Sequence, residues 1–429
     1  MLDINRIREN TDEVIRGLAK RNFTADFSHV IMLDDKRKAL TFESENLKAQ
    51  KNKVSADIPM KKKNQEDVSE LLAEMKVIAD KTKEIEIELN NVKKEIQEFL
   101  EVLPNIPADD VQQGGPEENK VVSVYGKKPE FSFVPKDHVT LCETLNLIDY
   151  KRGVKIGGNG FWVYTGIGAI VEWALLNYFV EEHLKDGYEF LLPPHILTYE
   201  CGYTAGQFPK FQDDVFKLKE EENKGYTQFI LPTAETALVN YHRDEILKEE
   251  ELPKKYFAYT PCYRKEAGSY RAEERGMIRG HQFNKIEMFQ YTTPENSDAA
   301  LDELVDKAVR LMDGLGLHFR LSKLAAGDCS HSMAKTLDIE VWIPSMGIYK
   351  EVSSASNAKD YQARRGNIRF KREQSGKNEY LHTLNASGLA TSRILPAIVE
   401  QFQNEDGSIT IPEVLRKWIG KDMIKIEKK

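Results

Sequence analysis

The sequence predicts an α+β protein in which helices flank an antiparallel sheet and a coiled-coil hairpin precedes it. Residues 29–103 contain no glycine and repeat apolar side chains every seven positions, which indicates a pair of long helices. Residues 106–429 contain short strand-like runs joined by turns, and such runs favour antiparallel pairing. The linker "LPNIPADDVQQGGPEENK" separates the two parts. We therefore expect an N-terminal helical arm at 1–104 and a second domain at 105–429.

The expected hairpin rests on two heptad stripes. A short helix is expected first, over residues 3–20. The second long helix then carries one stripe at Val68, Met75, Thr82, Leu89, Ile96 and Leu103, and another at Leu71, Ile78, Ile85, Val92 and Phe99. The first long helix repeats Leu33, Leu40, Leu47 and Val54. A proline, three lysines and polar residues lie between the two helices, so we predict the tip of an antiparallel hairpin between Pro59 and Glu66.

The composition argues against several classes of protein. The chain has 429 residues and a net charge of −8, which by itself counts against a nucleic-acid binder. It has no run of about 18 apolar residues, so we expect no membrane span. Its four cysteines are scattered without C-x-x-C spacing, which favours a reduced, cytoplasmic protein over a zinc or disulfide framework. It also lacks a Walker loop and a G-x-G-x-x-G after a strand, so any nucleotide site must be built differently.

The expected hairpin has one basic side. The first helix and the tip carry Lys48, Lys51, Lys53, Lys61, Lys62 and Lys63, whereas the second helix is richer in glutamate. Such a charge run is typical of a solvated coiled-coil surface. A projecting basic face would equally suit a phosphate backbone. The charges alone leave both interpretations open.

The stretch from Tyr263 to Glu287 carries the densest charge of the second domain. Arg264 and Glu266 alternate at the end of one predicted strand, and Arg279, Phe283 and Glu287 alternate along the return strand. We expect these side chains on one face of the sheet. Arginines beside an aromatic ring suit a nucleoside triphosphate, because arginine grips phosphate with two hydrogen bonds. A salt-bridged hairpin without a ligand is the alternative.

Three further stretches carry candidate ligands. Arg393 lies in the first turn of a predicted helix and could hold a terminal phosphate or lie on the surface. Glu351 and Ser354 supply the oxygen ligands that Mg²⁺ takes beside phosphates, although a solvated strand edge would carry the same residues. Thr233 and Glu235 suit a small ligand with an ammonium group, or a helix N-cap with an acidic first turn.

Together these stretches resemble the seryl-tRNA synthetase family, within the class II aminoacyl-tRNA synthetases. The resemblance is carried by "YTPCYRKEAG", "RGMIRGHQFNKIE", "EVSSASNAKDYQARRGNIRF" and "HTLNASGLATSR", which are similar to the family's motif 2 and motif 3 strings. It covers nearly the whole chain, including the hairpin. It implies a class II synthetase fold with an antiparallel sheet flanked by helices. It also implies an enzyme that activates serine with ATP and then transfers the seryl group to the 3′ end of tRNA(Ser), and of tRNA(Sec) where that tRNA is a substrate.

The resemblance also implies a role for each candidate residue. Arg264 and Arg393 would be catalytic. The serine pocket would be formed by Thr233, Glu235, Arg264, Glu287, Asn385 and Ser387. ATP would be held by Arg264, Glu266, Arg279, Phe283, Glu351, Ser354 and Arg393, with Mg²⁺ on Glu351 and Ser354. The six lysines of the hairpin would bind tRNA, and the protein would be a homodimer.

The sequence departs from the family mainly in the loop "SYRAEERG", residues 269–276. Glu273 and Glu274 lie where the tRNA 3′ end would approach, and acidic side chains there would repel phosphate. Two alternatives to a serine–tRNA ligase therefore remain open. One is a divergent copy that makes seryl-adenylate for another acceptor, and the other is a non-catalytic tRNA-binding protein.

Overall fold

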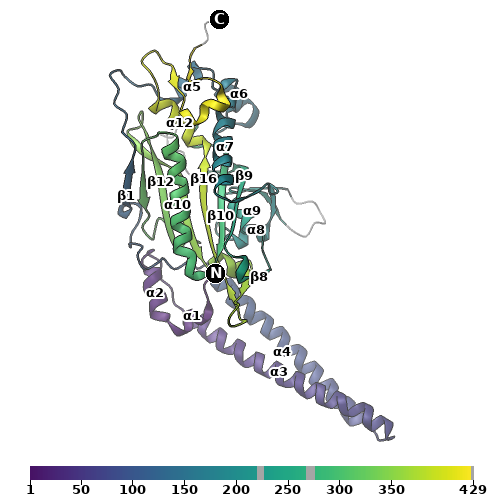
Figure 1. The fold of residues 1–429 in the computed structure, drawn as a ribbon. Helices are drawn as coiled ribbons and strands as arrows, with labels where there is room; N and C mark the ends of the chain where they lie inside the picture. The colour runs from purple at the N-terminus through teal and green to yellow at the C-terminus, as the bar shows by residue number, and fades with distance from the viewer. Residues whose placement is uncertain (220–226, 267–275, 427–429) are drawn as a thin grey trace. The chain divides into compact units, whose positions relative to one another are not determined.

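A computed structural model describes residues 1–219, 227–266 and 276–426 of the chain (Figure 1). The chain divides into two compact units. One unit contains residues 2–18 and 23–104, and the other contains residues 1, 19–22 and 105 onward. No helix among the described residues is long and apolar enough to cross a membrane.

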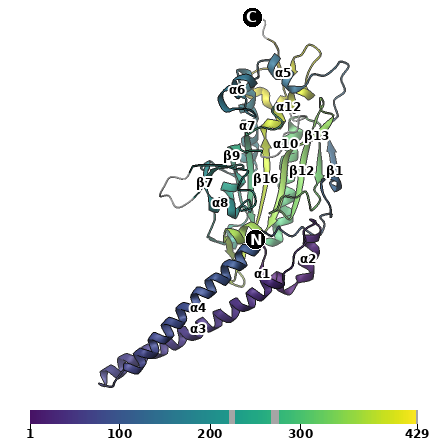
Figure 2. The same ribbon diagram turned by 180° about the vertical axis from the view of Figure 1, so that it is seen from behind.

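The first unit is built around the predicted hairpin. Two short helices, α1 (Ile4–Glu9) and α2 (Thr11–Ala19), replace the single expected helix, because the chain leaves helical geometry at Asn10. The long helices α3 (Ser28–Lys63) and α4 (Ser69–Glu101) then pack side by side, which confirms the coiled-coil prediction (Figure 2). Their interface buries predicted heptad residues, among them Leu33, Leu40, Leu47, Ile78, Ile85, Leu89, Val92 and Ile96.

The tip of the hairpin lies farther along the chain than the sequence predicted. Helix α3 continues through Pro59 and ends at Lys63, so the connection is Asn64–Val68. A proline inside a helix removes only one backbone hydrogen bond, although it strains the preceding turn. In this long helix it does not terminate the helical run.

The second unit is built on an eight-stranded sheet with strand order β1-β11-β12-β13-β16-β10-β9-β4. Every neighbouring pair is antiparallel except β4 with β9, which confirms the predicted antiparallel sheet. The strands are β1 (Lys120–Tyr125), β4 (Glu189–Leu191), β9 (Lys254–Tyr263), β10 (Gln282–Thr292), β11 (Phe319–Lys323), β12 (Lys335–Ile343), β13 (Ile348–Lys359) and β16 (His382–Ala390).

Three long helices cover one face of this sheet: α7 (Ile167–Lys185), α10 (Ser297–Gly314) and α12 (Thr391–Gln401) (Figures 1 and 2). The main apolar core lies between these helices and the strands. On β10, Ile286 and Met288 belong to this core. Because side chains alternate along a strand, Lys285 and Glu287 point to the opposite face. That opposite face carries the candidate site.

Smaller elements pack around the sheet. The short helices are α5 (His138–Thr144), α6 (Tyr150–Gly157), α8 (Tyr199–Thr204), α9 (Glu235–Leu238), α11 (Tyr361–Arg365) and α13 (Arg416–Ile419). The short strands are β2 (Ile148–Asp149), β3 (Val163–Tyr164), β5 (Ile196–Thr198), β6 (Phe216–Lys217), β7 (Gln228–Ile230), β8 (Ile246–Lys248), β14 (Arg369–Lys371), β15 (Asn378–Tyr380), β17 (Ile409–Thr410) and β18 (Met423–Ile424). Among these, α9 and α11 pack with the site-bearing face of β9 and β10.

Candidate active site

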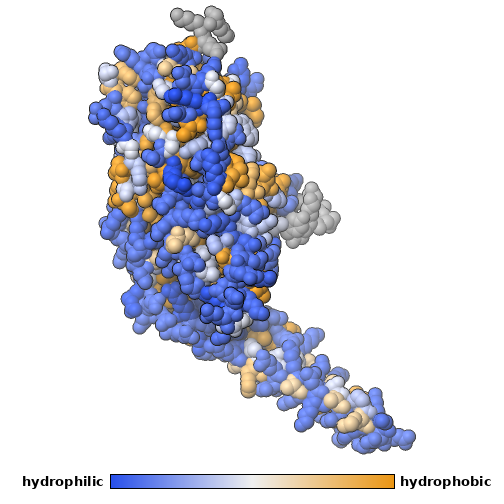
Figure 3. Space-filling view, viewed as in Figure 1, coloured by the Kyte–Doolittle hydropathy of each residue, from blue (hydrophilic) through white to orange (hydrophobic). Residues whose placement is uncertain are grey.

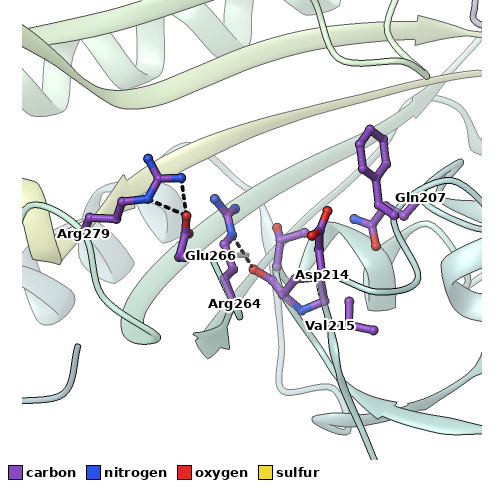
Figure 4. Close-up of a pocket in the computed structure, with 9 residues that line it drawn as sticks. Gln207, Asp214, Val215, Arg264, Glu266 and Arg279 are labelled. Atoms are coloured by element: carbon purple, nitrogen blue, oxygen red, sulfur yellow. Dashed lines mark hydrogen bonds and ion pairs between the residues drawn. The ribbon is translucent and has the colours of Figure 1, made fainter. Parts of the chain in front are cut away.

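Two adjoining cavities lie on the site-bearing face, with volumes of about 350 Å³ and about 80 Å³. Both are lined by Arg264, Glu266 and Arg279, so these residues lie between them. Figure 4 shows these three residues among those that line the larger cavity. The larger cavity is also lined by Gln207, Phe211, Asp214, Val215, Pro232 and Thr233. The smaller one is also lined by Ile278, Gly280, Phe283, Lys285, Glu351, Val352, Ser387, Ala390, Ser392 and Arg393.

Arg264 lies just beyond the end of β9. Its amide donates to the carbonyl of His281 at 2.9 Å, which extends the β9–β10 pairing by one residue. Its Nε donates to the carbonyl of Pro232 at 3.3 Å, and its guanidinium lies 5.2 Å from the centre of the Phe283 ring. The side chain is thus held at the junction of the two cavities by a carbonyl and an aromatic face.

Glu266 does not continue the strand, so the prediction that Arg264 and Glu266 share one strand face is wrong. Strand β9 ends at Tyr263, and Glu266 has a φ of +48°, in the left-handed region that side chains rarely adopt. This turn brings its carboxylate to Arg279, whose Nε and Nη2 lie 2.6 and 2.5 Å from Glu266 Oε2. Arg279 also lies outside a strand, since β10 begins at Gln282.

Arg393 is the third residue of α12, as the sequence predicted. Its Nε donates to the carbonyl of Ile278 at 3.0 Å, and its Nη1 donates to the carbonyl of Glu351 at 2.6 Å. The same Nη1 lies 3.6 Å from the Glu351 carboxylate. These contacts bring the first turn of α12 next to β13 and direct a fixed positive charge into the smaller cavity.

The two candidate metal ligands, Glu351 and Ser354, both lie on β13. Across the ladder from Ser354 lies Asp338, which accepts a hydrogen bond from it. Burial and the nearby charge of Glu351 raise the pKa of Asp338 well above its ordinary value, and its Oδ1 is buried without a hydrogen-bond partner in the described structure.

These oxygen groups fit Mg²⁺, which usually takes one or two carboxylates and completes its shell with water and substrate phosphates. No group of three or more His, Cys, Asp or Glu side chains in the described ranges forms an all-protein metal cage. Glu351 and Ser354 therefore suit a cation that arrives with a nucleotide.

The candidate serine pocket centres on Glu287, whose side chain is 1% exposed. Its Oε1 accepts a hydrogen bond from Asn385 Nδ2 at 3.1 Å, and its Oε2 forms an ion pair with the ammonium of Lys285. Lys285 also donates to Thr233 Oγ1 at 2.6 Å. Four polar side chains thus meet at one point: Glu287 and Lys285 from β10, Asn385 from β16 and Thr233 from the segment just before α9. Ser387 lines the adjoining smaller cavity.

Glu235 opens α9 beside this cluster. Its amide donates to Thr233 Oγ1 at 3.3 Å, although the N-cap of α9 is Ala234, which makes no side-chain cap hydrogen bond. Its Oε1 accepts from Gln362 Nε2 at 2.8 Å. Burial and the charge of Glu287 raise the pKa of Glu235 to about 7, against the opposing effect of Lys285 and Arg264. Glu235 is therefore poised to change its charge near neutral pH.

Two acceptor atoms of the pocket accept no hydrogen bond from the described residues. They are Glu287 Oε2, whose described contact is the ion pair with Lys285, and Asn385 Oδ1, and both are buried. Buried polar atoms are normally satisfied by a hydrogen-bond donor. Because the Lys285 ammonium already contacts Glu287 Oε2, Asn385 Oδ1 is the acceptor that a donor group of the ligand would satisfy.

Of the six lysines proposed for the hairpin, Lys61, Lys62 and Lys63 form the last turn of α3, and Lys48, Lys51 and Lys53 lie earlier in the same helix. Figure 3 shows that the surface of the long helices is mostly hydrophilic. Lys48 forms an ion pair with Glu86 of α4 at 2.8 Å, which reduces the charge that it can offer to a ligand. The other five, Lys51, Lys53, Lys61, Lys62 and Lys63, are exposed.

The sequence analysis missed several residues of the site, among them Lys285, Gln362 and Asp338. Lys285 could have been found, because it alternates with Phe283 and Glu287 along β10. Gln362 and Asp338 gave no usable signal, since only the tertiary fold brings them to Glu235 and Ser354. In the unusual loop, residues 269–275 lie outside the described residues, including Glu273 and Glu274.

The antiparallel sheet, with arginines around a pair of adjoining cavities on one face, is the architecture of a class II aminoacyl-tRNA synthetase. Residues 216–402 match the family model of the tRNA synthetase class II core domain (G, H, P, S and T). Residues 1–107 match the seryl-tRNA synthetase N-terminal domain. The chain belongs to the seryl-tRNA synthetase family.

Individual relatives match along the whole chain. It is 66% identical to serine–tRNA ligase 2 of Clostridium acetobutylicum, over 99% of this chain and 100% of that one. It is 43% identical to the serine–tRNA ligase of Geobacter sulfurreducens, over 98% and 99%. The structure of the Pyrococcus horikoshii seryl-tRNA synthetase complexed with ATP matches with a TM-score of 0.90 at 33% identity, covering 100% of both chains.

Proposed function

We propose that this protein is a serine–tRNA ligase that activates L-serine with ATP and transfers the seryl group to the 3′ end of tRNA(Ser). The observation that carries the proposal is the position of Arg264, which borders both cavities and lies beside the acidic pocket of Glu235 and Glu287. One cation can thus serve an amino acid on one side and a nucleotide on the other. Full-length similarity to named serine–tRNA ligases supports the same conclusion.

The chemistry requires charge stabilisation more than covalent catalysis. The serine carboxylate attacks the α-phosphorus of ATP, and pyrophosphate leaves in line. Both reactants are anions, so the protein must hold them together against repulsion. Arg264 contacts the carboxylate and then the α-phosphate in this proposal. An arginine suits the task because it stays protonated throughout the reaction.

The remaining ligand groups divide between nucleotide and amino acid. Phe283 stacks on adenine and Glu266 accepts a hydrogen bond from it, while Arg279 and Arg393 hold the β- and γ-phosphates. Glu351 and Ser354 hold Mg²⁺, which adds positive charge beside the phosphates. Thr233, Glu235, Glu287, Asn385 and Ser387 enclose the serine. A pocket that hydrogen-bonds the hydroxyl rejects alanine, since its own polar groups would then go unpaired.

Replacing Glu351 with glutamine should raise the Mg²⁺ concentration that gives half-maximal activity about tenfold or more, because a neutral amide is a weaker ligand for a hard cation. A Mg²⁺ titration of ATP–pyrophosphate exchange measures the change, and Mn²⁺ binding followed by electron paramagnetic resonance gives an independent readout. The control is Glu250→Gln, an exposed glutamate outside both cavities. An unchanged Mg²⁺ requirement in Glu351→Gln would remove this residue from the metal site.

We propose that residues 1–104 bind tRNA through the basic side of the hairpin, and that residues 105–429 carry out catalysis. We also propose that the protein acts in the cytoplasm. Its four cysteines are free thiols, and a reducing compartment keeps cysteines in that state.

The protein forms a homodimer in this proposal. Apolar side chains are exposed on α7 and on the segment from β4 to β5: Ile170, Trp173, Phe190, Leu192 and Ile196. An apolar surface of this kind marks an interface. Trp173→Glu should therefore yield a monomer in size-exclusion chromatography with light scattering. Val134→Glu, at an exposed valine elsewhere, should leave the mass unchanged. Equal masses for wild type and Trp173→Glu would contradict this interface.

One experiment tests the proposed function as a whole. Serine-dependent ATP–pyrophosphate exchange is measured first, and then the charging of tRNA(Ser) and tRNA(Sec) transcripts with serine. Exchange followed by charging of tRNA(Ser) is the expected result. Exchange without charging would instead favour a maker of seryl-adenylate for another acceptor. Absence of exchange with retained tRNA binding would favour a non-catalytic tRNA-binding protein.

A further inference from the structure

Lys285 is a buried cation inside the amino-acid pocket to which no role has yet been given. It is 5% exposed and lies on β10 two residues before Glu287. Its ammonium pairs with Glu287 Oε2 and donates to Thr233 Oγ1 at 2.6 Å. Lys285 also lines the smaller cavity together with Arg264 and Ser387. It therefore touches the groups that would receive the amino acid.

The pocket contains two acidic side chains but must bind a substrate with one ammonium group. A buried charge is costly unless it is paired, and Glu287 is paired with Lys285. Glu235 is different, because its described partner is the neutral amide of Gln362. Within the described part of the chain, no lysine or arginine forms an ion pair with Glu235. The two carboxylates are thus unequal.

We propose that Lys285 is a specificity-determining residue: it neutralises Glu287 and leaves Glu235 as the single carboxylate that pairs with the ammonium of the substrate. The inference rests on the proposed function, since it assumes that the pocket binds an amino acid. Glu287 then serves as a hydrogen-bond acceptor for the hydroxyl rather than as a counter-charge. When Glu235 is ionised, Glu235, Glu287 and Lys285 together carry one net negative charge, which matches one ammonium, and Arg264 remains to pair with the carboxylate.

Two substitutions, Glu235→Gln and Lys285→Met, should have opposite effects on the KM for serine. Glu235→Gln should raise the KM for serine roughly 10- to 100-fold, as expected for loss of a charge-assisted hydrogen bond. Adding Lys285→Met should lower that KM again by about tenfold, because Glu287 regains an unpaired charge for the ammonium. The KM for ATP should stay within about twofold of wild type in both variants, because the polar contacts of Lys285 and Glu235 are to groups of the serine pocket. Pyrophosphate exchange at varied serine and ATP measures these constants.

A matched control is provided by Lys307 of α10. It is also 5% exposed, and it pairs with Asp186 at 2.6 Å and with Glu303 at 3.7 Å, outside both cavities. Lys307→Met removes a comparable buried ion pair, so the double variant Glu235→Gln/Lys307→Met should keep the high serine KM. Recovery in this control as well would overturn the proposal.

A purely structural role for Lys285 predicts the opposite result. The double variant Glu235→Gln/Lys285→Met would then be worse than Glu235→Gln, with both serine and ATP affected, and this outcome would overturn the proposal. Lys285→Gln serves as a second variant that keeps a polar group at the site. Thermal melting identifies the better-folded of the two for kinetic comparison. Absence of serine-dependent exchange in the wild-type protein would instead contradict the proposed function.

The wild-type protein provides a test that needs no substitution at Lys285. Glu235 is faced by Glu287 and Lys285 from β10, by Arg264 beyond β9 and by Gln362 from α11. Its pKa of about 7 means that it becomes ionised as the pH rises through neutrality. The KM for serine should therefore fall between pH 6 and pH 8, in proportion to the rise in the ionised fraction of one carboxyl group with a pKa of about 7. A flat profile, or one that persists in Glu235→Gln, would contradict the assignment.

Discussion

Replacing Arg264 with glutamine should lower the kcat/KM of serine-dependent ATP–pyrophosphate exchange about a thousandfold. Removing one preorganised donor from a developing negative charge costs roughly 10² to 10³ in rate, and in the proposed mechanism Arg264 serves two anions in succession. The side chain is held by the Pro232 carbonyl and the Phe283 ring, so its position does not depend on the substrate. The loss should appear in kcat and also as a higher KM for serine, because the proposed mechanism has Arg264 contact the serine carboxylate before the reaction.

The matched control for Arg264 is Arg364. Its guanidinium lies 4.6 Å from the centre of the Tyr380 ring, and its Nε pairs with Asp360 at 2.7 Å. It thus reproduces the arginine–aromatic contact outside both cavities. Arg364→Gln should retain exchange activity within about threefold, because it removes a contact without touching the reacting groups. A loss below tenfold in Arg264→Gln, or an equal loss in both variants, would refute the assigned role.

Deleting residues 30–100 should abolish tRNA charging and leave serine-dependent pyrophosphate exchange near the wild-type rate. The hairpin forms most of a compact unit of its own, and both candidate cavities are lined by residues of the other unit. Activation of serine requires only those cavities, whereas capture of tRNA requires a basic surface that follows its backbone. Normal charging by the shortened protein would refute the role of the hairpin.

A charge reversal in the full-length protein tests which part of the hairpin binds tRNA. Changing Lys51, Lys53, Lys61, Lys62 and Lys63 to glutamate should raise the KM for tRNA about a hundredfold and flatten its dependence on salt, because each lost phosphate contact reduces the salt slope. The control changes five exposed lysines of α4: Lys76, Lys81, Lys83, Lys93 and Lys94. It alters the net charge equally. Similar losses in both variants would mean that total charge, and not the first helix and tip, governs tRNA binding.

Periodic sequence features predicted the fold well. The heptad stripes predicted α3 and α4, because apolar side chains that repeat every seven residues line one side of a helix and pack against a partner helix. Alternation along β10 predicted that Phe283 and Glu287 share a face, and the structure places both in the site. The parts of the site that lie on regular elements were therefore readable from the sequence.

Features that depend on loop geometry were not readable. The turn at Glu266 is set by a left-handed backbone conformation, which no alternation pattern indicates. The continuation of α3 through Pro59 depends on the length of helix around it. Gln207 and Asp214 line the larger cavity from an irregular segment, where spacing carries no information about direction. Such residues need the tertiary structure.

The pairing of Arg279 with Glu266, and of Arg393 with Glu351, has a consequence for discrimination among nucleotides. In the proposed binding mode, each terminal phosphate takes over an arginine that already has a counter-ion, so binding is an exchange of partners. AMP and adenosine cannot complete that exchange, because they bring no terminal phosphates. The resting ion pairs therefore reduce the net gain from the terminal phosphates of ATP, while AMP gains nothing from either arginine and should leave readily.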